Sequence, residues 1–344
     1  MNKASNEPVK VGLYGAGGHV VTQHLPNLKS FDNAKIVAIC DIDGDKAQAA
    51  ATQFDIPTVY TDGLKMVAEE PLDALWSIVP AAARPAVEIA AAKKGIHLFC
   101  DKPQTLDMKS ALEIDDALKQ SGAMSTVCFR ERYRPIFQEA KKLLDDKEIV
   151  HIRFQNVDPL PPDDPDTDRP GWEKIIEGHA NFLGWGPHAI DYCRYVSGLD
   201  IDQVQAFFCE RDTYHVPLST MYNFRMSNSA TMTMTFLHTS ANTPANEPWF
   251  LFYYEGGYLA IYNGYSHIEM NGHTVYRSEQ YQPWRELDYT FIKAIENGDD
   301  SELLNDFSDG LKTHAPLLAG WESSKRGGIP INIDTFVEES RIRS

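Results

Sequence analysis

The chain has 344 residues, of which 43% are hydrophobic and 24% charged, and a formal net charge of −17. This length predicts two domains, and the composition is that of a globular protein with a large buried core. The negative charge argues against nucleic-acid or anionic-membrane partners, because their phosphates would be repelled at long range. The first ten residues contain no apolar run and no later segment approaches a membrane span, so we expect a cytoplasmic protein.

The spacing of cysteines and histidines gives no indication of a disulfide or a metal site. The cysteines are odd in number and never spaced C-x-x-C, which favours buried thiols in a reducing compartment. Residues 164–168 (DPDTD) resemble the start of a calcium-binding EF-hand loop, but Arg169 and Ile175 replace its Gly and Glu. We therefore expect a solvated loop there and no metal. The five cysteines are Cys40, Cys100, Cys128, Cys193 and Cys209.

The first 145 residues alternate short β-rich runs with helical segments. The intervening segments DKAQAAATQF, RPAVEIAAAKKG and DMKSALEIDDALKQSG predict helices, the last two ending at Gly95 and Gly122. This alternation predicts an α/β fold with a doubly wound parallel sheet that carries helices on both faces. The predicted strands are 9–14, 35–40, 72–79, 96–100 and 125–129.

The pattern changes after about residue 148. A strand at 149–157 is followed by a proline-rich acidic loop, and a helix is predicted near 186–197. Residues 201–276 are rich in alternating strands, and their EGG and NG turns predict an antiparallel sheet. Two further helices, at about 284–297 and 306–326, follow this sheet.

The stretch KVGLYGAGGHV, residues 10–20, has the character of a dinucleotide-binding turn between a strand and a helix. Gly15 permits the tight turn and Gly17 lets the backbone approach a pyrophosphate, which the following helix N-terminus would hold. Val20 stands where the third glycine of G-x-G-x-x-G is expected. That glycine serves close packing of the helix on the strand, and Gly18 can provide part of this close packing one residue earlier. A purely structural glycine turn is the alternative interpretation.

An acidic residue at the end of the second predicted strand supports the nucleotide interpretation. Asp41 in VAICD is placed to accept hydrogen bonds from the adenosine ribose, and a carboxylate there repels a 2′-phosphate. We therefore favour NAD, with NADP not excluded. The predicted cofactor-binding residues are Gly15, Ala16, Gly17, Gly18, His19, Val20, Asp41, Pro80, Asp101 and Lys102.

Two candidate proton-transfer residues lie further along the chain. Lys102 follows the predicted strand at 96–100, and a lysine desolvated at the carboxyl end of a sheet has a lowered pKa. His188 and Asp191 share one face near the start of a helix, whose dipole keeps the imidazole neutral. An exposed surface lysine and a structural histidine are the alternatives.

Together these motifs resemble the glucose–fructose oxidoreductase/inositol 2-dehydrogenase (Gfo/Idh/MocA) superfamily over nearly the whole chain. The family's E-K-P is matched by DKP at 101–103, its N-x-R-[FY] by RERY at 130–133, and its G-x-H-x-x-D by GPHAID at 186–191. The resemblance implies a Rossmann domain, at 1–130, and an α/β substrate and oligomerisation domain with a large, open-faced, mainly antiparallel sheet, at 131–335. We allow for the closing helix at 306–326 to pack back on the first domain.

The resemblance also implies an NAD-dependent oxidoreductase that acts on a hydroxyl of a sugar, polyol or related carbohydrate. Lys102 would handle the hydroxyl proton, and His188 would act as an acid/base beside the nicotinamide. A homodimer or homotetramer would form through the open sheet. The residues expected to bind the substrate are Asp191, Arg132, Tyr133, Trp172 and Trp185, the two tryptophans because they flank the loop that leads to His188.

One departure from the family concerns the chemistry. Many of its dehydrogenases carry an aspartate four residues before the histidine, and here that position is Gly184. Glu177, His179 and Asn181 lie just upstream, without any sign in the sequence that they replace it. Two alternatives therefore stay open: a lyase that recycles its NAD within each turnover, and a dinucleotide-binding regulator without catalysis.

Overall fold

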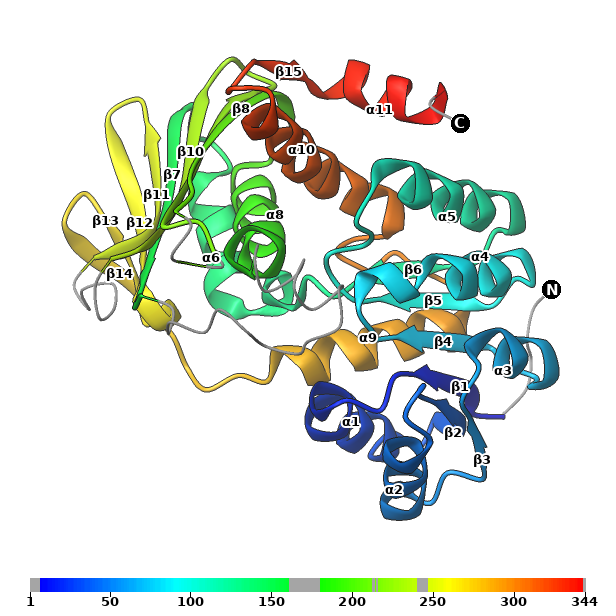
Figure 1. The fold of residues 1–344 in the computed structure, drawn as a ribbon. Coiled ribbons are helices and arrows are strands. Elements are labelled where there is room, and N and C mark those ends of the chain that lie inside the picture. Colours follow the sequence, from blue (N-terminus) through cyan, green and yellow to red (C-terminus); the bar gives the residue numbers. More distant parts are fainter. Residues whose placement is uncertain (1–6, 161–179, 212–213, 215, 240–246, 343–344) are drawn as a thin grey trace. The chain divides into compact units, whose positions relative to one another are not determined.

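The computed structural model describes residues 7–160, 180–211, 214, 216–239 and 247–342, without the side chains of 180–182. The chain forms two compact units (Figure 1). The first comprises residues 1–133 and 282–311, and the second comprises residues 134–281 and 312–344. Each unit is built on its own β-sheet.

The first unit contains a six-stranded parallel sheet with the order β3-β2-β1-β4-β5-β6. This is the doubly wound order of dinucleotide-binding folds, in which the chain returns to the centre after the third strand. The β4 residues are buried throughout, as expected for a central parallel strand. The strands are β1 (Val9–Tyr14), β2 (Ala34–Cys40), β3 (Thr58–Tyr60), β4 (Ala74–Ser77), β5 (His97–Cys100) and β6 (Ser125–Val127).

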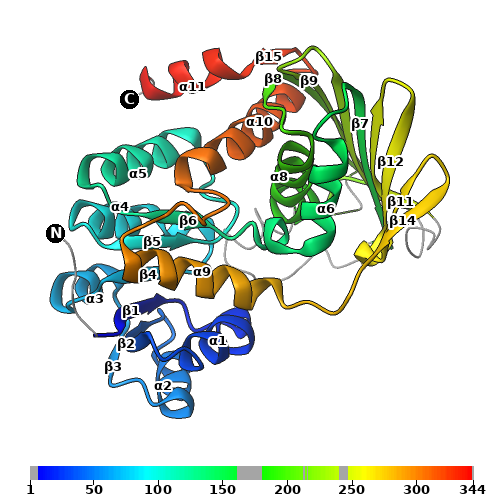
Figure 2. The same cartoon turned by 180° about the vertical axis from the view of Figure 1, so that it is seen from behind.

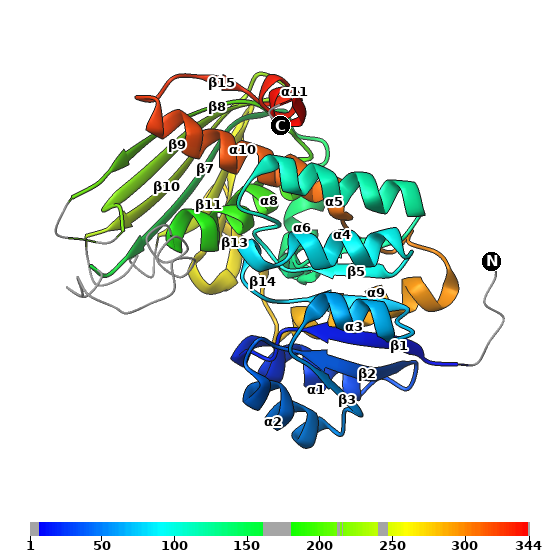
Figure 3. The same ribbon diagram turned by 45° about the vertical axis from the view of Figure 1, so that its right-hand side comes forward.

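Helices cover both faces of this sheet, because right-handed crossovers that run in opposite directions from its centre place their helices on opposite sides. Helices α3, α4 and α5 pack side by side (Figure 3), while α1 and α9 contact each other and the strands β1 and β2. The helices are η1 (Val20–His24), α1 (Leu25–Lys29), α2 (Gly44–Phe54), α3 (Gly63–Glu69), η2 (Ala81–Ala83), α4 (Pro85–Lys93), α5 (Met108–Ser121), η3 (Arg130–Tyr133) and α9 (Pro283–Asn297).

The second unit contains a nine-stranded sheet with the order β14-β13-β12-β11-β7-β10-β9-β8-β15. The neighbours β7 and β10 are parallel, and the other neighbouring pairs are antiparallel. The strands are β7 (Ile149–Asp158), β8 (Ile201–Cys209), β9 (Ser219–Met226), β10 (Thr231–His238), β11 (Pro248–Tyr254), β12 (Gly257–Tyr262), β13 (His267–Met270), β14 (His273–Arg277) and β15 (Ile331–Asn332).

One face of this second sheet carries helices and the other is open (Figure 2). On the helical side Tyr222 packs so closely on α10 that a Cβ at Gly320 would lie 2.1 Å from its ring. On the open side Phe207, Met221 and Tyr253 are exposed, and Phe207 is paired with Met221 across β8 and β9. The helices of this unit are α6 (Pro135–Leu144), η4 (Ala180–Trp185), α8 (Gly186–Ser197), η5 (Asn263–Tyr265), α10 (Phe307–Lys325, from residue 312 onward) and α11 (Ile333–Ile342).

The predicted fold class is confirmed: a parallel Rossmann sheet is joined to a second, mostly antiparallel sheet. The sequence interpretation missed β3 and α11, because β3 is only three half-buried residues long and α11 follows a two-residue strand. Residues 282–311, including α9, belong to the first unit, whereas most of α10 belongs to the second. None of the helices within the described ranges is both long and apolar enough to cross a membrane.

Candidate functional site

The glycine turn at the end of β1 has the geometry of a phosphate cradle. Gly15 has a φ of +123°, and a Cβ there would lie 2.3 Å from the carbonyl oxygen of Ile78, so no other residue fits. A Cβ at Gly17 or Gly18 would meet no heavy atom of the described residues within 4 Å. The turn is therefore tight on its inner side and open above Gly17 and Gly18, where a pyrophosphate would approach the backbone.

Asp41 is held beside this turn at the end of β2. Its Oδ2 accepts a hydrogen bond from the Ala16 backbone N–H at 2.8 Å, and its Oδ1 accepts from the Asp43 N–H at 2.9 Å. These bonds fix the carboxylate next to the place where the adenosine end of a dinucleotide lies in this fold. The residues present thus fit NAD, and Gly15, Gly17 and Asp41 would hold it.

Val20 lies on the inner side of the helix that follows the turn. Its side chain is 1% exposed, within η1, and the Val21 N–H bonds to the Gly17 carbonyl at 3.1 Å. Val20 therefore contributes to the core of the unit, and the open side of the turn is formed by Gly17 and Gly18.

Aromatic and basic side chains from α9 and η3 surround the exposed His19. Its ring lies edge-on to His24 at 5.3 Å and to Trp284 at 5.7 Å, and the Arg130 guanidinium lies 4.2 Å from the Trp284 ring centre. Burial lowers the pKa of His19, and the neighbouring His24 lowers it further. His19 is thus a neutral hydrogen-bonding group immediately before η1.

A buried ion pair joins η1, the helix that follows the glycine turn, to α9. His24 Nδ1 lies 2.8 Å from Asp288 Oδ1, and the carboxylate also accepts from Trp76 Nε1 at 3.0 Å and from Asn27 Nδ2 at 3.0 Å. Burial opposes protonation of His24, but Asp288 outweighs it and raises the pKa to about 10. The sequence interpretation did not find this pair, since its members are 264 positions apart.

The DKP loop after β5 carries Lys102. The Lys102 backbone N–H donates to Asp101 Oδ1 at 2.8 Å, and the Lys102–Pro103 peptide bond is cis. Burial lowers the pKa of the half-buried Lys102 ammonium, partly offset by the Asp101 carboxylate. The direction of this shift is the one expected of a proton-transfer lysine, and that role of Lys102 stays a prediction.

Arg84 is hydrogen-bonded to the backbone of this loop. The sequence interpretation did not identify it. It is 1% exposed, and its guanidinium donates to the backbone carbonyls of Asp101 and Pro103, on either side of Lys102. It also lies 3.3 Å from the Cys100 sulfur. The signal that could have found Arg84 was an arginine at the start of an otherwise apolar, buried helix.

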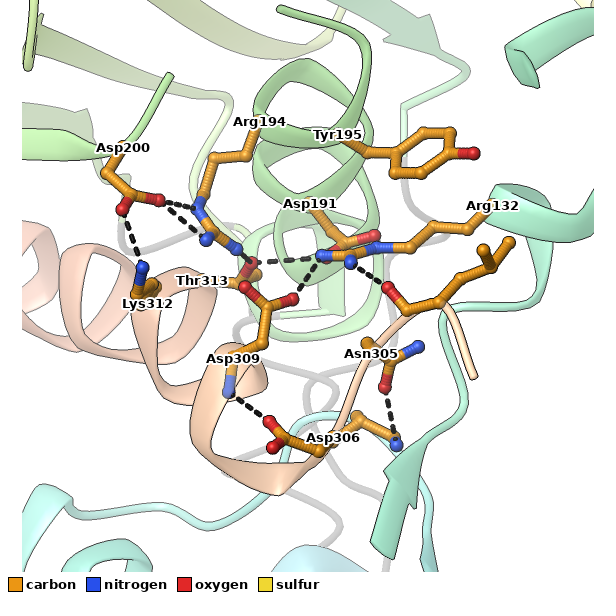
Figure 4. A network of polar contacts seen from close by, with 12 residues as sticks. Arg132, Asp191, Arg194, Tyr195, Asp200, Asn305, Asp306, Asp309, Lys312 and Thr313 are labelled. Atoms are coloured by element: carbon orange, nitrogen blue, oxygen red, sulfur yellow. Dashed lines mark hydrogen bonds and ion pairs between the residues drawn. The ribbon is translucent and has the colours of Figure 1, made fainter. Parts of the chain in front are cut away.

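Arg132 and Tyr133, predicted to bind the substrate, hold the segment between α9 and α10 within the first unit. The Arg132 guanidinium pairs with Asp309 at 2.7 Å and donates to the Leu304 carbonyl at 2.5 Å (Figure 4). The Tyr133 hydroxyl accepts from the Leu304 N–H at 3.1 Å. Their assignment as substrate ligands stays a prediction.

His188 lies in the first turn of α8, within an aromatic cluster of the second unit. Its Nδ1 is 2.8 Å from the Tyr192 hydroxyl, and the two rings are stacked, with centres 5.4 Å apart. Trp185, half-buried at the start of the helix, lies edge-on to His188 at 5.6 Å and to Trp249 at 5.6 Å. The predicted pair of Trp185 and His188 is thus in ring contact.

Asp191, on the same helix, is buried and contacts α10. It accepts from the Thr313 hydroxyl at 3.3 Å, and the same hydroxyl lies 2.9 Å from Arg194 Nη1 (Figure 4). Arg194 and Lys312 each bond Asp200 at 2.7 Å, which extends the network. The expected role of Asp191 in orienting substrate or histidine stays a prediction.

Gly184 lies in η4, one turn before His188. Among the described residues, no heavy atom lies within 4 Å of a Cβ built at this position. Trp172, Glu177 and His179 lie outside the described residues, as does the acidic run at 164–168. In the described part of the chain no group of three His, Cys, Asp or Glu side chains is placed to hold a metal ion.

Two family models match the chain. Residues 9–129 match GFO_IDH_MocA, described as an oxidoreductase family with an NAD-binding Rossmann fold, and residues 137–260 match the GFO/IDH/MocA C-terminal domain. The two matches cover the first and the second sheet, respectively, for most of their length.

Sequence relatives and solved structures agree with these matches. The chain is 30% identical over 213 residues to the inositol 2-dehydrogenase/D-chiro-inositol 3-dehydrogenase of Lactiplantibacillus plantarum (60% of this chain, 57% of that protein). It is 25% identical over 201 residues to the myo-inositol 2-dehydrogenase of Thermotoga maritima (58% of each). The chain thus spans about half the length of the curated relatives it matches.

A crystal structure of an oxidoreductase from Agrobacterium radiobacter, in complex with NAD+, L-tartaric acid and magnesium, has the same fold. It is 20% identical, with a TM-score of 0.78, and the alignment covers 95% of this chain and 99% of that chain. At this identity the similarity establishes the fold alone.

Proposed function

Because the chain belongs to the GFO/IDH/MocA oxidoreductase family, we propose that it is an NAD-dependent dehydrogenase acting on a hydroxyl of a sugar, polyol or related carbohydrate. The observation that carries this proposal is Lys102, whose pKa is lowered by burial at the carboxyl end of β5. Ligands bind at these strand ends in doubly wound sheets. A lysine whose pKa is lowered releases its proton more readily than an ordinary lysine, and the oxidation of a hydroxyl requires a group that can take up the hydroxyl proton.

Bound NAD would supply the hydride acceptor at nicotinamide C4. The Nζ of the Lys102 amine would take up the hydroxyl proton as the hydride leaves the carbon that carries this hydroxyl. In the reverse reaction Lys102 would return the proton. Arg84 supports this role by holding both carbonyls that flank Lys102. Since only one proton leaves the hydroxyl, His188, whose Nδ1 is engaged by Tyr192, would pass this same proton on through Nε2.

The proposed substrate class follows from the relatives and from Trp185. Both relatives described above are named as dehydrogenases of inositols, which are cyclic polyols. Trp185 lies against His188 and would stack on the apolar face of a sugar or polyol ring. NAD is preferred over NADP, because the Asp41 carboxylate would repel a 2′-phosphate.

We propose further that the chain is cytoplasmic and associates through the open face of its second sheet. All five cysteines are free thiols, four of them buried, which suits a reducing compartment. Phe207, Met221 and Tyr253 expose apolar surface on the open face, and a second copy would bury it.

A screen of inositols, sugars and sugar acids on the purified protein tests the activity. NADH formation and product structure are followed together, and NAD binding is measured separately by calorimetry. We expect net NADH that falls by about 10²- to 10⁴-fold in Lys102→Ala while NAD still binds. Product without net NADH would identify the NAD-recycling lyase, an alternative that the absent acid at Gly184 keeps open. Bound NAD without any product would identify the regulator.

A further inference from the structure

The Tyr192 hydroxyl lies within hydrogen-bond distance of His188 Nδ1. The two residues are one helical turn apart on α8, so their side chains meet on the same face. His188 is 3% exposed and Tyr192 is fully buried, with 2.8 Å between Nδ1 and the hydroxyl. At this depth a hydrogen bond is strong and its loss is costly.

The position of the Tyr192 hydroxyl is set by the core of the second unit. Its ring packs on Phe137 of α6 at 4.9 Å and on Phe250 of β11 at 6.3 Å. It is also stacked on His188 at an interplanar angle of 24°. The imidazole is thereby held in one orientation by a group that itself has little freedom.

Several charged groups on the elements around α8 have described partners away from the imidazole. On α6, Arg134 lies over Tyr265 and Lys141 over Tyr195. On β7, His151 bonds Thr231, and Asp158 accepts from Asn156. On α8 itself, Asp191 contacts Thr313, Arg194 pairs with Asp200, and burial raises the pKa of the Cys193 thiol. The imidazole itself is hydrogen-bonded to the Tyr192 hydroxyl.

We propose that Tyr192 is the positioning residue for His188 and replaces the acid that is absent at Gly184; this rests on the proposed function. A hydroxyl can donate to Nδ1 of the neutral imidazole and accept from Nδ1–H of the imidazolium, whereas a carboxylate can only accept. Tyr192 therefore holds the ring in both protonation states while the proton moves at Nε2. Because it carries no charge, it stabilises the imidazolium less than an aspartate would.

Tyr192→Phe tests this proposal, because it removes the hydroxyl and keeps the packed ring. We expect kcat/KM to fall about 10-fold, as for a buried hydrogen bond to a charged group. The lost acceptor destabilises the imidazolium, so the acid limb of the pH profile moves to lower pH. Gly184→Asp adds the carboxylate at a position where a Cβ meets no described heavy atom within 4 Å. This variant should move that limb to higher pH and restore activity to Tyr192→Phe. Tyr195→Phe, a hydroxyl removed from the same helix, is the matched control.

A nitrogen-edited NMR titration of His188 separates this proposal from the proposed function. A lowered His188 pKa in Tyr192→Phe, together with the fall in kcat/KM, supports the proposal. An unchanged pKa, or a fall no larger than in Tyr195→Phe, overturns it. If the wild type turns over no carbohydrate, the proposed function and the catalytic meaning of Tyr192 both fail, whatever the titration shows.

Discussion

The two candidate proton-transfer residues are held by different kinds of interaction. Lys102 lies on a loop fixed by a buried cation, Arg84, and the same unit contains the buried ion pair His24–Asp288. His188 lies in an aromatic cluster and is oriented by the neutral hydroxyl of Tyr192. The difference implies that the first unit depends on charges and on pH, whereas the surroundings of His188 depend on packing and a neutral hydrogen bond.

The largest expected effect concerns Lys102 itself. Lys102→Arg keeps the positive charge but cannot release a proton near neutral pH, so kcat should fall by about 10²- to 10⁴-fold. Steady-state kinetics on the best substrate of the carbohydrate screen measures this. If Lys102→Arg retained most of the activity, the lysine would serve as a fixed charge and the contrast with His188 would disappear.

The next effect concerns Arg84 as the support of the Lys102 loop. Arg84→Met removes the buried guanidinium that donates to the backbone carbonyls of Asp101 and Pro103. Leaving a buried polar group without its hydrogen-bond partner costs about 1 to 3 kcal/mol. Urea unfolding measures the loss. Lys65→Met, which removes an exposed ion pair with Glu69, is the control and should change stability by less than about 1 kcal/mol.

The His24–Asp288 pair predicts a pH-dependent stability of the first unit. The folded pKa of His24, about 10, is above its unfolded value of 6.5, so the stabilisation is complete below pH 6.5 and is lost as the pH rises through 10. The thermal midpoint should therefore fall across this range. Asp288→Asn should flatten the profile, because an amide does not stabilise the imidazolium. An unchanged slope would show that the pair carries no charge.

The smallest expected effect is at Gly184. Gly184→Ala adds a methyl group that meets no described heavy atom within 4 Å, so the free energy of unfolding should change by less than about 1 kcal/mol and NAD affinity should stay the same. Gly15→Ala is the informative contrast, since its Cβ would meet the Ile78 carbonyl. Strong destabilisation by Gly184→Ala would mean that the position requires glycine and does not merely lack an acid.

Much of the fold and part of the candidate site were predictable from short-range patterns. The alternation of strands and helices predicted the Rossmann sheet, and helix 186–197 was placed with the bounds observed for α8. Tyr192 was also within reach, because an i, i+4 spacing from His188 places two side chains on one helical face. The sequence interpretation did not identify Tyr192, because Tyr192 lies outside the family's G-x-H-x-x-D motif, whereas Asp191, which contacts Thr313, lies within it.

The sequence by itself determined the parallel sheet, the glycine turn with its acid, and the location of Lys102 and His188 at element ends. Each of these depends on periodicity or on backbone demands within a few residues. Only the tertiary structure decided that Arg84 holds the Lys102 loop and that His24 meets Asp288. Such partners are chosen by burial, which forces distant polar groups to find one another in the core and leaves no trace in local spacing.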